Sequence, residues 1–168
     1  YGIAAGSNFI ATGMYKKVLV IGSEALSKIM DWEDRNTCVL FGDGASAVVL
    51  GEVEEGMGII SYHLAADGSG GEFLDMPGGG SRNPASIKTV TDKMHFLKMK
   101  GQDVFKFAVT VLPETVIKTL ENTGVAPEQI KMIVPHQANY RIIGSAAKRL
   151  SIDVEKFYMN MDRFGNTS

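Results

Sequence analysis

The chain is poor in cysteine and histidine. Its 168 residues contain one cysteine, Cys38, and three histidines. A single cysteine excludes an intrachain disulfide framework and a cysteine-rich zinc site, and it is typical of a protein kept in a reducing compartment. The three histidines are scattered along the chain, so they offer no metal-binding triad. We therefore expect a cytoplasmic protein without a metal.

Long apolar runs and an excess of charge are also missing. No window approaches the roughly 18 consecutive apolar residues of a membrane span, and no basic-then-apolar signal segment occurs near Tyr1. Lys and Arg total 17 against 19 Asp and Glu, which gives no basic field to attract nucleic acid or anionic lipid. Dinucleotide-binding, phosphate-loop and Gly-x-Ser-x-Gly motifs are absent as well. We expect neither nucleic acid nor a membrane as a partner.

The remaining sequence alternates between strand-like and helix-like segments. Small apolar residues over 1–14 predict a buried helix, and the apolar run 17–22 predicts a strand buried on both faces. Apolar runs bounded by turn residues predict further strands at 38–41, 45–53, 58–66, 131–134 and 157–161, and the first two are either two strands or one strand with a bend. Helical spacing predicts helices over 92–122, with a kink at Pro113 and a cap at Gly124, and over 139–150. This order predicts a mainly parallel, covered sheet of at least five strands.

Two polar segments directly follow predicted strands. Residues 135–139 (Pro-His-Gln-Ala-Asn) follow one strand, and residues 165–168 (Gly-Asn-Thr-Ser) follow another. Ligands of open α/β sheets gather at the carboxyl ends of strands, and there His136 and Asn166 can donate hydrogen bonds to one oxygen. Such a pair stabilises an enolate or oxyanion. Purely structural roles stay open for both residues, and Cys38 is interpreted as a small buried apolar residue.

Five motifs follow one another in a distinctive order. They are Phe-Gly-Asp-Gly-Ala at 41–45, Ala-Asp-Gly-Ser at 66–69, Gly-Gln-Asp-Val-Phe at 101–105, Pro-His-Gln-Ala-Asn at 135–139 with Arg141, and Asp-Arg-Phe-Gly-Asn-Thr-Ser at 162–168. Together they resemble the β-ketoacyl-acyl-carrier-protein synthase III family along the whole chain. The resemblance implies an α/β thiolase-like fold with stacked α-β-α-β-α layers. Residues 1–55 would end its N-terminal half, and residues 56–168 would form a truncated C-terminal half.

The resemblance also implies an acyltransferase of fatty acid biosynthesis. In the family, a cysteine takes the acyl group from acyl-CoA, and a histidine and an asparagine bind the thioester carbonyl of malonyl-acyl carrier protein while it loses CO₂. His136 and Asn166 match these two residues. The cysteine belongs to an Ala-Cys-x-Gly-Phe segment that would fall just before Tyr1, so we expect this chain alone to lack the nucleophile. CoA and carrier-protein thioesters would be substrates, with no resident cofactor.

Further residues match binding positions of the family. Arg35 resembles the arginine that lies against the adenine of CoA, where a guanidinium can stack on an aromatic base. Residues that resemble the lining of the pantetheine tunnel are Gly101, Phe105 and Asn139. Residues that resemble the docking patch for acidic carrier protein are Lys106, Arg141, Lys148 and Arg149. The last three can share one helix face, and a merely solvated helix surface stays the alternative.

The resemblance implies a homodimer as well, paired through the strand that corresponds to residues 17–21. Two other functions stay open. The chain could belong to another synthase of the thiolase superfamily, of the polyketide or hydroxymethylglutaryl-CoA type, or it could be a non-catalytic dimerising module. An Ala-Cys-x-Gly-Phe segment ahead of Tyr1 would favour the condensing enzyme of fatty acid biosynthesis.

Overall fold

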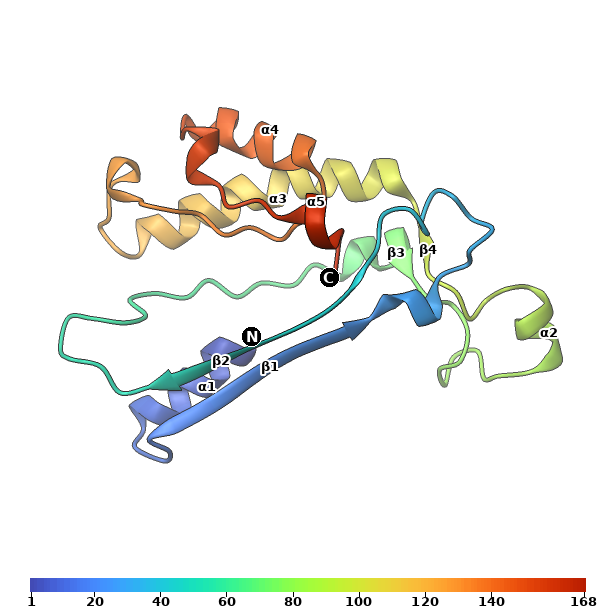
Figure 1. Cartoon of the computed structure of the whole chain (residues 1–168), viewed down its shortest axis with the longest axis horizontal. Coiled ribbons are helices and arrows are strands. Elements are labelled where there is room, and N and C mark those ends of the chain that lie inside the picture. Colours follow the sequence, from blue (N-terminus) through green and yellow to red (C-terminus); the bar gives the residue numbers. More distant parts are fainter.

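The computed structural model describes residues 1–168, and a long antiparallel ribbon runs along the length of the molecule (Figure 1). The α-helices are α1 (Gly2–Ala11), α2 (Ile87–Thr91), α3 (Gly101–Glu121), α4 (Tyr140–Leu150) and α5 (Met161–Phe164). The strands are β1 (Lys17–Ala25), β2 (Asp43–Gly51), β3 (Leu74–Asp75) and β4 (Lys98–Met99). Short 3₁₀ helices cover Leu26–Ile29, Gly68–Phe73, Pro127–Gln129 and Val154–Lys156.

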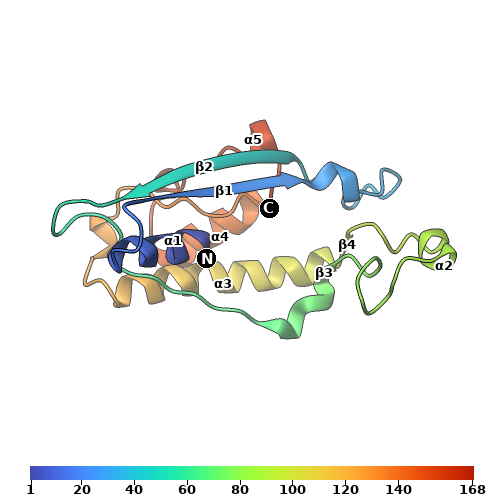
Figure 2. The ribbon, with the colours of Figure 1, turned by 90° about the horizontal axis from the view of Figure 1, so that it is seen from below.

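Strands β1 and β2 form the longest ladder of the molecule. They pair antiparallel over their whole length, from Lys17 opposite Gly51 to Ala25 opposite Asp43. Helix α1 lies against this ribbon (Figure 2). Gly6 permits the close approach, because a Cβ at this position would lie only 2.9 Å from the side chain of Leu50. The small apolar residues of the first helix therefore serve close packing on the strands.

Helices α3 and α4 pack against each other on the other side of the molecule (Figure 1). Helix α4 begins at the N-cap Asn139, whose side chain accepts a hydrogen bond from the backbone N–H of Arg141. Its buried face and the segments beneath it form the main apolar core, made of Ile143, Ala147, Ile152 and Phe157. The predicted helix over 139–150 is confirmed, and this core fixes the segments that flank it.

Several predicted strands are wrong in this chain. In the predicted strand 38–41, residues 38–40 form a turn and Phe41 makes only an isolated bridge, and residues 58–66 form no ladder. Residues 131–134 and 157–161 contribute only one isolated parallel bridge, between Ile133 and Phe157. The expected sheet of at least five mainly parallel strands is therefore replaced by two antiparallel pairs and isolated parallel bridges. A strand exists only where a neighbour completes its ladder, and apolar runs do not reveal whether this chain supplies the neighbour.

The predicted long helix over 92–122 begins later than expected. Helix α3 begins at Gly101, after the short strand β4, and it ends at Glu121. Pro113 lies buried within it. The C-cap is Asn122, and Gly124, the predicted cap, lies two residues further on with a positive φ of 67°. The helix predicted near the start is confirmed as α1, but the expected burial is wrong for this chain, since only Ala4 and Gly6 of this helix are buried. The division into halves at residue 55 stays a prediction.

The ribbon leaves a large apolar surface uncovered. Leu19 is 58% exposed, Ile21 63% and Val49 68%, and only 15 of the 168 residues are buried. The expectation of a strand buried on both faces is therefore wrong for this chain. Apolar surfaces of this size mark places where other protein parts pack. None of the helices combines the length and apolar character needed to cross a membrane.

Candidate functional site

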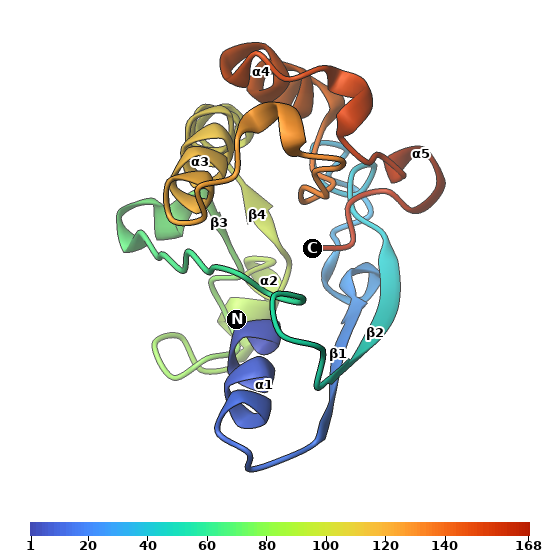
Figure 3. The same cartoon turned by 90° about the vertical axis from the view of Figure 1, so that its left-hand side faces the viewer.

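A cleft of about 690 Å³ opens where the ends of β1 and β2 meet the segments around His136 and the C-terminal residues. Figure 3, a view along the long axis, shows the C-terminus inside the arc formed by α5 and the β1–β2 ribbon on one side and α3 and α4 on the other. The cleft is lined by Gly22, Glu24, Asp43, Gly44, Ala45, Ser46, Val134, Pro135, His136, Gln137, Tyr158, Asn160, Phe164, Gly165, Thr167 and Ser168. His136 thus shares one cleft with the residues on both sides of Asn166.

The His136 segment is held in place by backbone pairing and by one amide side chain. Ile133 donates its N–H to the carbonyl of Lys156 and accepts from the N–H of Tyr158, both at 2.8 Å. Gln137 Nε2 then donates to the carbonyl of Tyr158 at 2.9 Å, and Gln137 Oε1 accepts from the N–H of Asn160 at 2.9 Å. These bonds hold Ile133 and Gln137 in place, and His136 lies between them in the sequence.

The imidazole of His136 keeps its donor free. Its pKa is lowered from the ordinary value of 6.5, and the cause is desolvation by the surrounding groups, although the residue as a whole remains exposed. Desolvation disfavours the charged imidazolium, so the ring stays neutral to a lower pH than usual. A neutral imidazole has one N–H to donate, and no group of this chain hydrogen-bonds the ring.

Asn166 is fixed by pairing with the segment that leads into β2. It forms a parallel bridge with Phe41, in which Gly42 donates to the carbonyl of Asn166 at 2.9 Å and Asn166 donates to the carbonyl of Leu40 at 3.0 Å. Its side-chain Oδ1 accepts from the N–H of Ser168 at 3.0 Å. Because Oδ1 is engaged, the Nδ2 amide remains as a donor.

Two glycines make this pairing sterically feasible. Gly165 has a φ of 67° and a ψ of −158°, a conformation that a side chain strongly disfavours. A Cβ on Gly42 would lie 2.3 Å from the carbonyl oxygen of Phe164. The segment that carries Asn166 can therefore lie against β2 only because both positions lack a side chain.

His136 lines the cleft, and Asn166 lies between two of its lining residues, Gly165 and Thr167. An imidazole N–H and an amide Nδ2 are donors of the kind that stabilises an oxygen on which negative charge develops. Asp43 also lines the cleft, and hydrogen bonds from the Ser27 hydroxyl and backbone N–H lower the pKa of its carboxyl group. No group of three or more His, Cys, Asp or Glu side chains lies close enough to hold a metal ion.

The other predicted binding residues lie outside this cleft. Arg35 is an exposed residue of the turn before β2, and Gly101 and Phe105 belong to the first turns of α3. Asn139 caps α4, so its Oδ1 is engaged with the backbone of Arg141. None of these residues lines the cleft around His136, and their assignments stay predictions.

The predicted docking residues fall into two groups. Arg141 and Lys148 lie about two turns apart on the exposed side of α4, opposite its buried residues. Arg149 instead turns toward α3, where its guanidinium lies 3.3 Å from the carboxylate of Glu114. Lys106 on α3 is paired loosely with Asp103 at 3.5 Å. Arg149 is thus ion-paired within this chain whereas Arg141 and Lys148 are not, and the docking role of all four residues stays a prediction.

Two positioning residues escaped the sequence-based prediction. Gln137 and Gly42 both lie inside motifs that the sequence singled out, and neither was assigned a role. Their function depends on contacts with Tyr158 and Phe164, which are distant in the sequence. Such a role becomes visible only when the positions of the contacting residues in the fold are known.

Comparison with known proteins identifies the family. Residues 1–68 match the family model described as 3-oxoacyl-[acyl-carrier-protein (ACP)] synthase III, and residues 120–168 match its C-terminal counterpart. A β-ketoacyl-[acyl-carrier-protein] synthase III from Caldanaerobacter subterraneus subsp. tengcongensis is 57% identical over 168 residues, which are 100% of this chain and 51% of that protein. One from Desulfitobacterium hafniense strain Y51 is 55% identical with the same coverage. The chain thus spans about half the length of the curated relatives it matches.

Solved structures agree with the sequence comparison. The crystal structure of β-ketoacyl-[acyl carrier protein] synthase III from Thermus thermophilus superposes with a TM-score of 0.88 at 44% identity, over 100% of this chain and 51% of that one. The expected α/β thiolase-like fold class is confirmed by this similarity. The chain belongs to the 3-oxoacyl-[acyl-carrier-protein] synthase III family.

Proposed function

We propose that this chain supplies the histidine and asparagine of a decarboxylating condensing enzyme of fatty acid biosynthesis. The enzyme joins a short acyl-CoA primer to malonyl-acyl carrier protein and yields 3-oxoacyl-acyl carrier protein, CO₂ and CoA. The observation that carries the proposal is the cleft in which His136 lies beside the segment of Asn166. The names of the relatives favour this function over a polyketide or hydroxymethylglutaryl-CoA synthase and over a non-catalytic module.

The proposed roles follow from where charge develops. When the malonyl thioester loses CO₂, the electron pair of the broken carbon–carbon bond moves toward the thioester oxygen. His136 N–H and Asn166 Nδ2 stabilise that enolate oxygen, and the carbanion then attacks an acyl group on a cysteine. The cysteine is the one expected in the Ala-Cys-x-Gly-Phe segment of the complete protein. Removing one such donor typically costs about a hundredfold or more in rate.

Partners and assembly belong to the same proposal. Acyl-CoA and the phosphopantetheine of malonyl-acyl carrier protein are substrates, and a cytoplasmic homodimer is the working form. The uncovered apolar residues of β1 and its unpaired edge support pairing between two copies. Light scattering on the complete protein at micromolar concentration should give the mass of a dimer, and a monomer there would refute that part.

The test uses the complete protein with His136→Ala and Asn166→Ala. Labelled acyl transfer from acyl-CoA to the enzyme should persist, because acylation needs a thiolate rather than these two donors. Release of CO₂ from malonyl-acyl carrier protein should fall about a hundredfold or more. The matched control is His63→Ala, a histidine outside the cleft, which should leave both steps unchanged. Variants that fail to acylate yet release CO₂ normally would show that the roles are assigned wrongly.

A further inference from the structure

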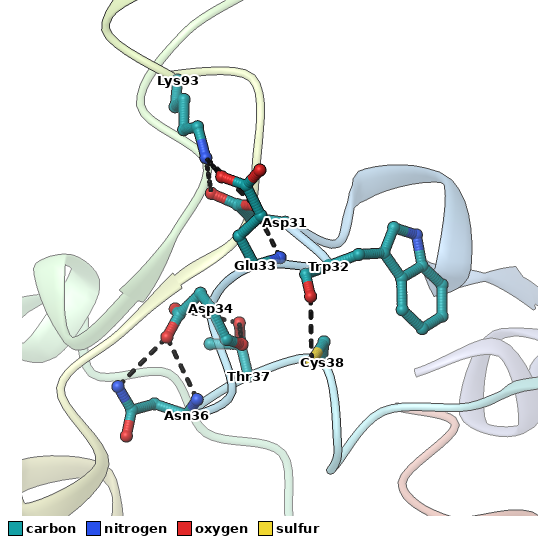
Figure 4. Close-up of polar contacts among 8 residues, drawn as sticks. All are labelled: Asp31, Trp32, Glu33, Asp34, Asn36, Thr37, Cys38 and Lys93. Atoms are coloured by element: carbon teal, nitrogen blue, oxygen red, sulfur yellow. Dashed lines mark hydrogen bonds and ion pairs between the residues drawn. The ribbon is translucent and has the colours of Figure 1, made fainter.

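The turn that carries Arg35 is held by a dense set of hydrogen bonds (Figure 4). Asp34 Oδ1 accepts from the backbone N–H and side-chain amide of Asn36 at 3.0 and 3.1 Å, and its Oδ2 accepts from the Thr37 hydroxyl at 3.0 Å. Asp31 Oδ1 accepts from the N–H of Glu33 at 3.1 Å. The turn is therefore rigid on both sides of Arg35.

A single lysine from a distant segment joins this turn. Lys93 follows α2, and its Nζ lies 3.0 Å from Asp31 Oδ2 and 2.5 Å from Glu33 Oε2. Lys93 adopts a left-handed backbone with a φ of 53°, an uncommon conformation for a lysine. Figure 4 shows its side chain reaching down to the two carboxylates, with the indole of Trp32 turned away from them.

The charges of the turn are distributed unevenly. Three carboxylates, those of Asp31, Glu33 and Asp34, lie within four residues of Arg35 in the sequence, and each of them has a partner other than the arginine. Hydrogen bonds to Glu33 and Asp31 raise the pKa of Lys93, and the bond from Lys93 lowers the pKa of Asp31. Arg35 is exposed and takes part in none of the six ion pairs of the chain.

An arginine so close to carboxylates would ordinarily pair with one of them, because a guanidinium binds a carboxylate through two parallel hydrogen bonds. We propose that Lys93 is a positioning residue that keeps the Asp31 and Glu33 carboxylates engaged and so leaves the Arg35 guanidinium free to bind the nucleotide of CoA. The inference rests on the proposed function, in which Arg35 contacts CoA. Lys93 itself need not touch the substrate.

The test uses Lys93→Met in the complete protein. The KM for acyl-CoA and the Kd for free CoA by calorimetry should each rise about fivefold, the effect of losing one partly exposed charge contact. The kcat should stay unchanged, because the reacting atoms lie elsewhere. A primer in which the acyl group is carried on pantetheine, without the nucleotide, should show no change in KM. Lys93→Arg should restore most of the affinity, since it keeps the charge.

Two further variants separate competition from a loss of structure. Lys88→Met removes the same charge from a neighbouring exposed pair with Asp92 and should leave all constants unchanged. Adding Asp31→Asn and Glu33→Gln to Lys93→Met should recover CoA binding, because of the three carboxylates only that of Asp34 then remains, and it stays bonded to Asn36 and Thr37. Asparagine at position 31 keeps an oxygen for the N–H of Glu33.

The outcomes distinguish a failure of the role of Lys93 from a failure of the proposed function. Three results would each overturn the role of Lys93. They are an equal increase in KM with both primers, an unchanged Kd for CoA in Lys93→Met, and no recovery of CoA binding in the triple variant. Calorimetry needs no turnover, so a protein that binds CoA in the expected pattern but forms no 3-oxoacyl product would contradict the proposed function and leave the role of Lys93 standing. A protein that binds no CoA would contradict both.

Discussion

Replacing Gly42 by alanine tests the geometry that places Asn166. A Cβ at this position would lie 2.3 Å from the Phe164 carbonyl oxygen, whereas ordinary contacts of a Cβ begin at 3.4 Å. The neighbouring atom is backbone, so it cannot rotate away as a flexible side chain would. The segment 164–168 must therefore move by about 1 Å, and Asn166 moves with it.

The displacement has a cost in stability and a larger one in rate. It strains the two backbone hydrogen bonds between Asn166 and the residues on either side of Phe41, at 2.9 and 3.0 Å. Each such bond contributes about 1 kcal/mol, so we expect a loss of about 2 kcal/mol in the free energy of unfolding. A misplacement of about 1 Å in a catalytic group can cost about a hundredfold in rate.

The assay is CO₂ release from malonyl-acyl carrier protein by the complete Gly42→Ala protein, measured beside acyl transfer from acyl-CoA. Decarboxylation should fall about a hundredfold at a temperature where the variant is folded, while acylation falls much less. Gly71→Ala is the matched control, since a Cβ there meets nothing within 4 Å. A Gly42→Ala protein that decarboxylates at the normal rate would refute the link between this contact and the position of Asn166.

Two further predictions concern charge. The imidazole of His136 should titrate below its ordinary pKa of 6.5 in an NMR experiment, because desolvation disfavours the cation. The folded protein then binds fewer protons at this residue than the unfolded chain does, so the group should lower the free energy of unfolding as the pH falls through 6.5 and have no effect well above that pH. His136→Gln should therefore lose less stability on acidification than the unsubstituted protein. An equal loss of stability in the two proteins would contradict the lowered pKa. Lys148→Glu should raise the KM for malonyl-acyl carrier protein in a salt-dependent way. Arg149→Gln should mainly remove the contact with Glu114, at a cost of at most about 1 kcal/mol in the free energy of unfolding. Equal increases in the KM for malonyl-acyl carrier protein in Lys148→Glu and Arg149→Gln would refute the different roles of these two residues.

The sequence predicted the helices better than the strands, for a physical reason. Helices α1 and α4 complete their own backbone hydrogen bonds, so local spacing and the cap at Asn139 are enough to locate them. A strand needs a neighbour, and residues 131–134 and 157–161 find only one bridging pair in each other. The same limit explains 58–66, an apolar run that pairs with nothing in this chain.

The residues of the site could be predicted from the sequence, but the contacts that hold them in place could not. His136 and Asn166 stood out because polar residues follow apolar runs, and the structure brings their segments to one cleft. The separation of Arg149 from Arg141 and Lys148 could not be read from spacing, because it depends on Glu114 of a different helix. Lys93 gave no signal at all, since its partners lie about 60 residues earlier in the chain.

The position of Asn166 joins the two predicted halves of the chain. Phe41 and Gly42 belong to residues 1–55, whereas Asn166 belongs to residues 56–168, and their bridge is the contact that sets the register of the C-terminal segment. His136, by contrast, is tethered by Gln137 to Tyr158 within the second half alone. If the two halves shifted relative to each other, Asn166 would follow the first and His136 the second, and the shared oxygen would lose one donor. A condensing site built in this way needs rigid packing between the halves, which is the role we assign to the close glycine contact at Gly42.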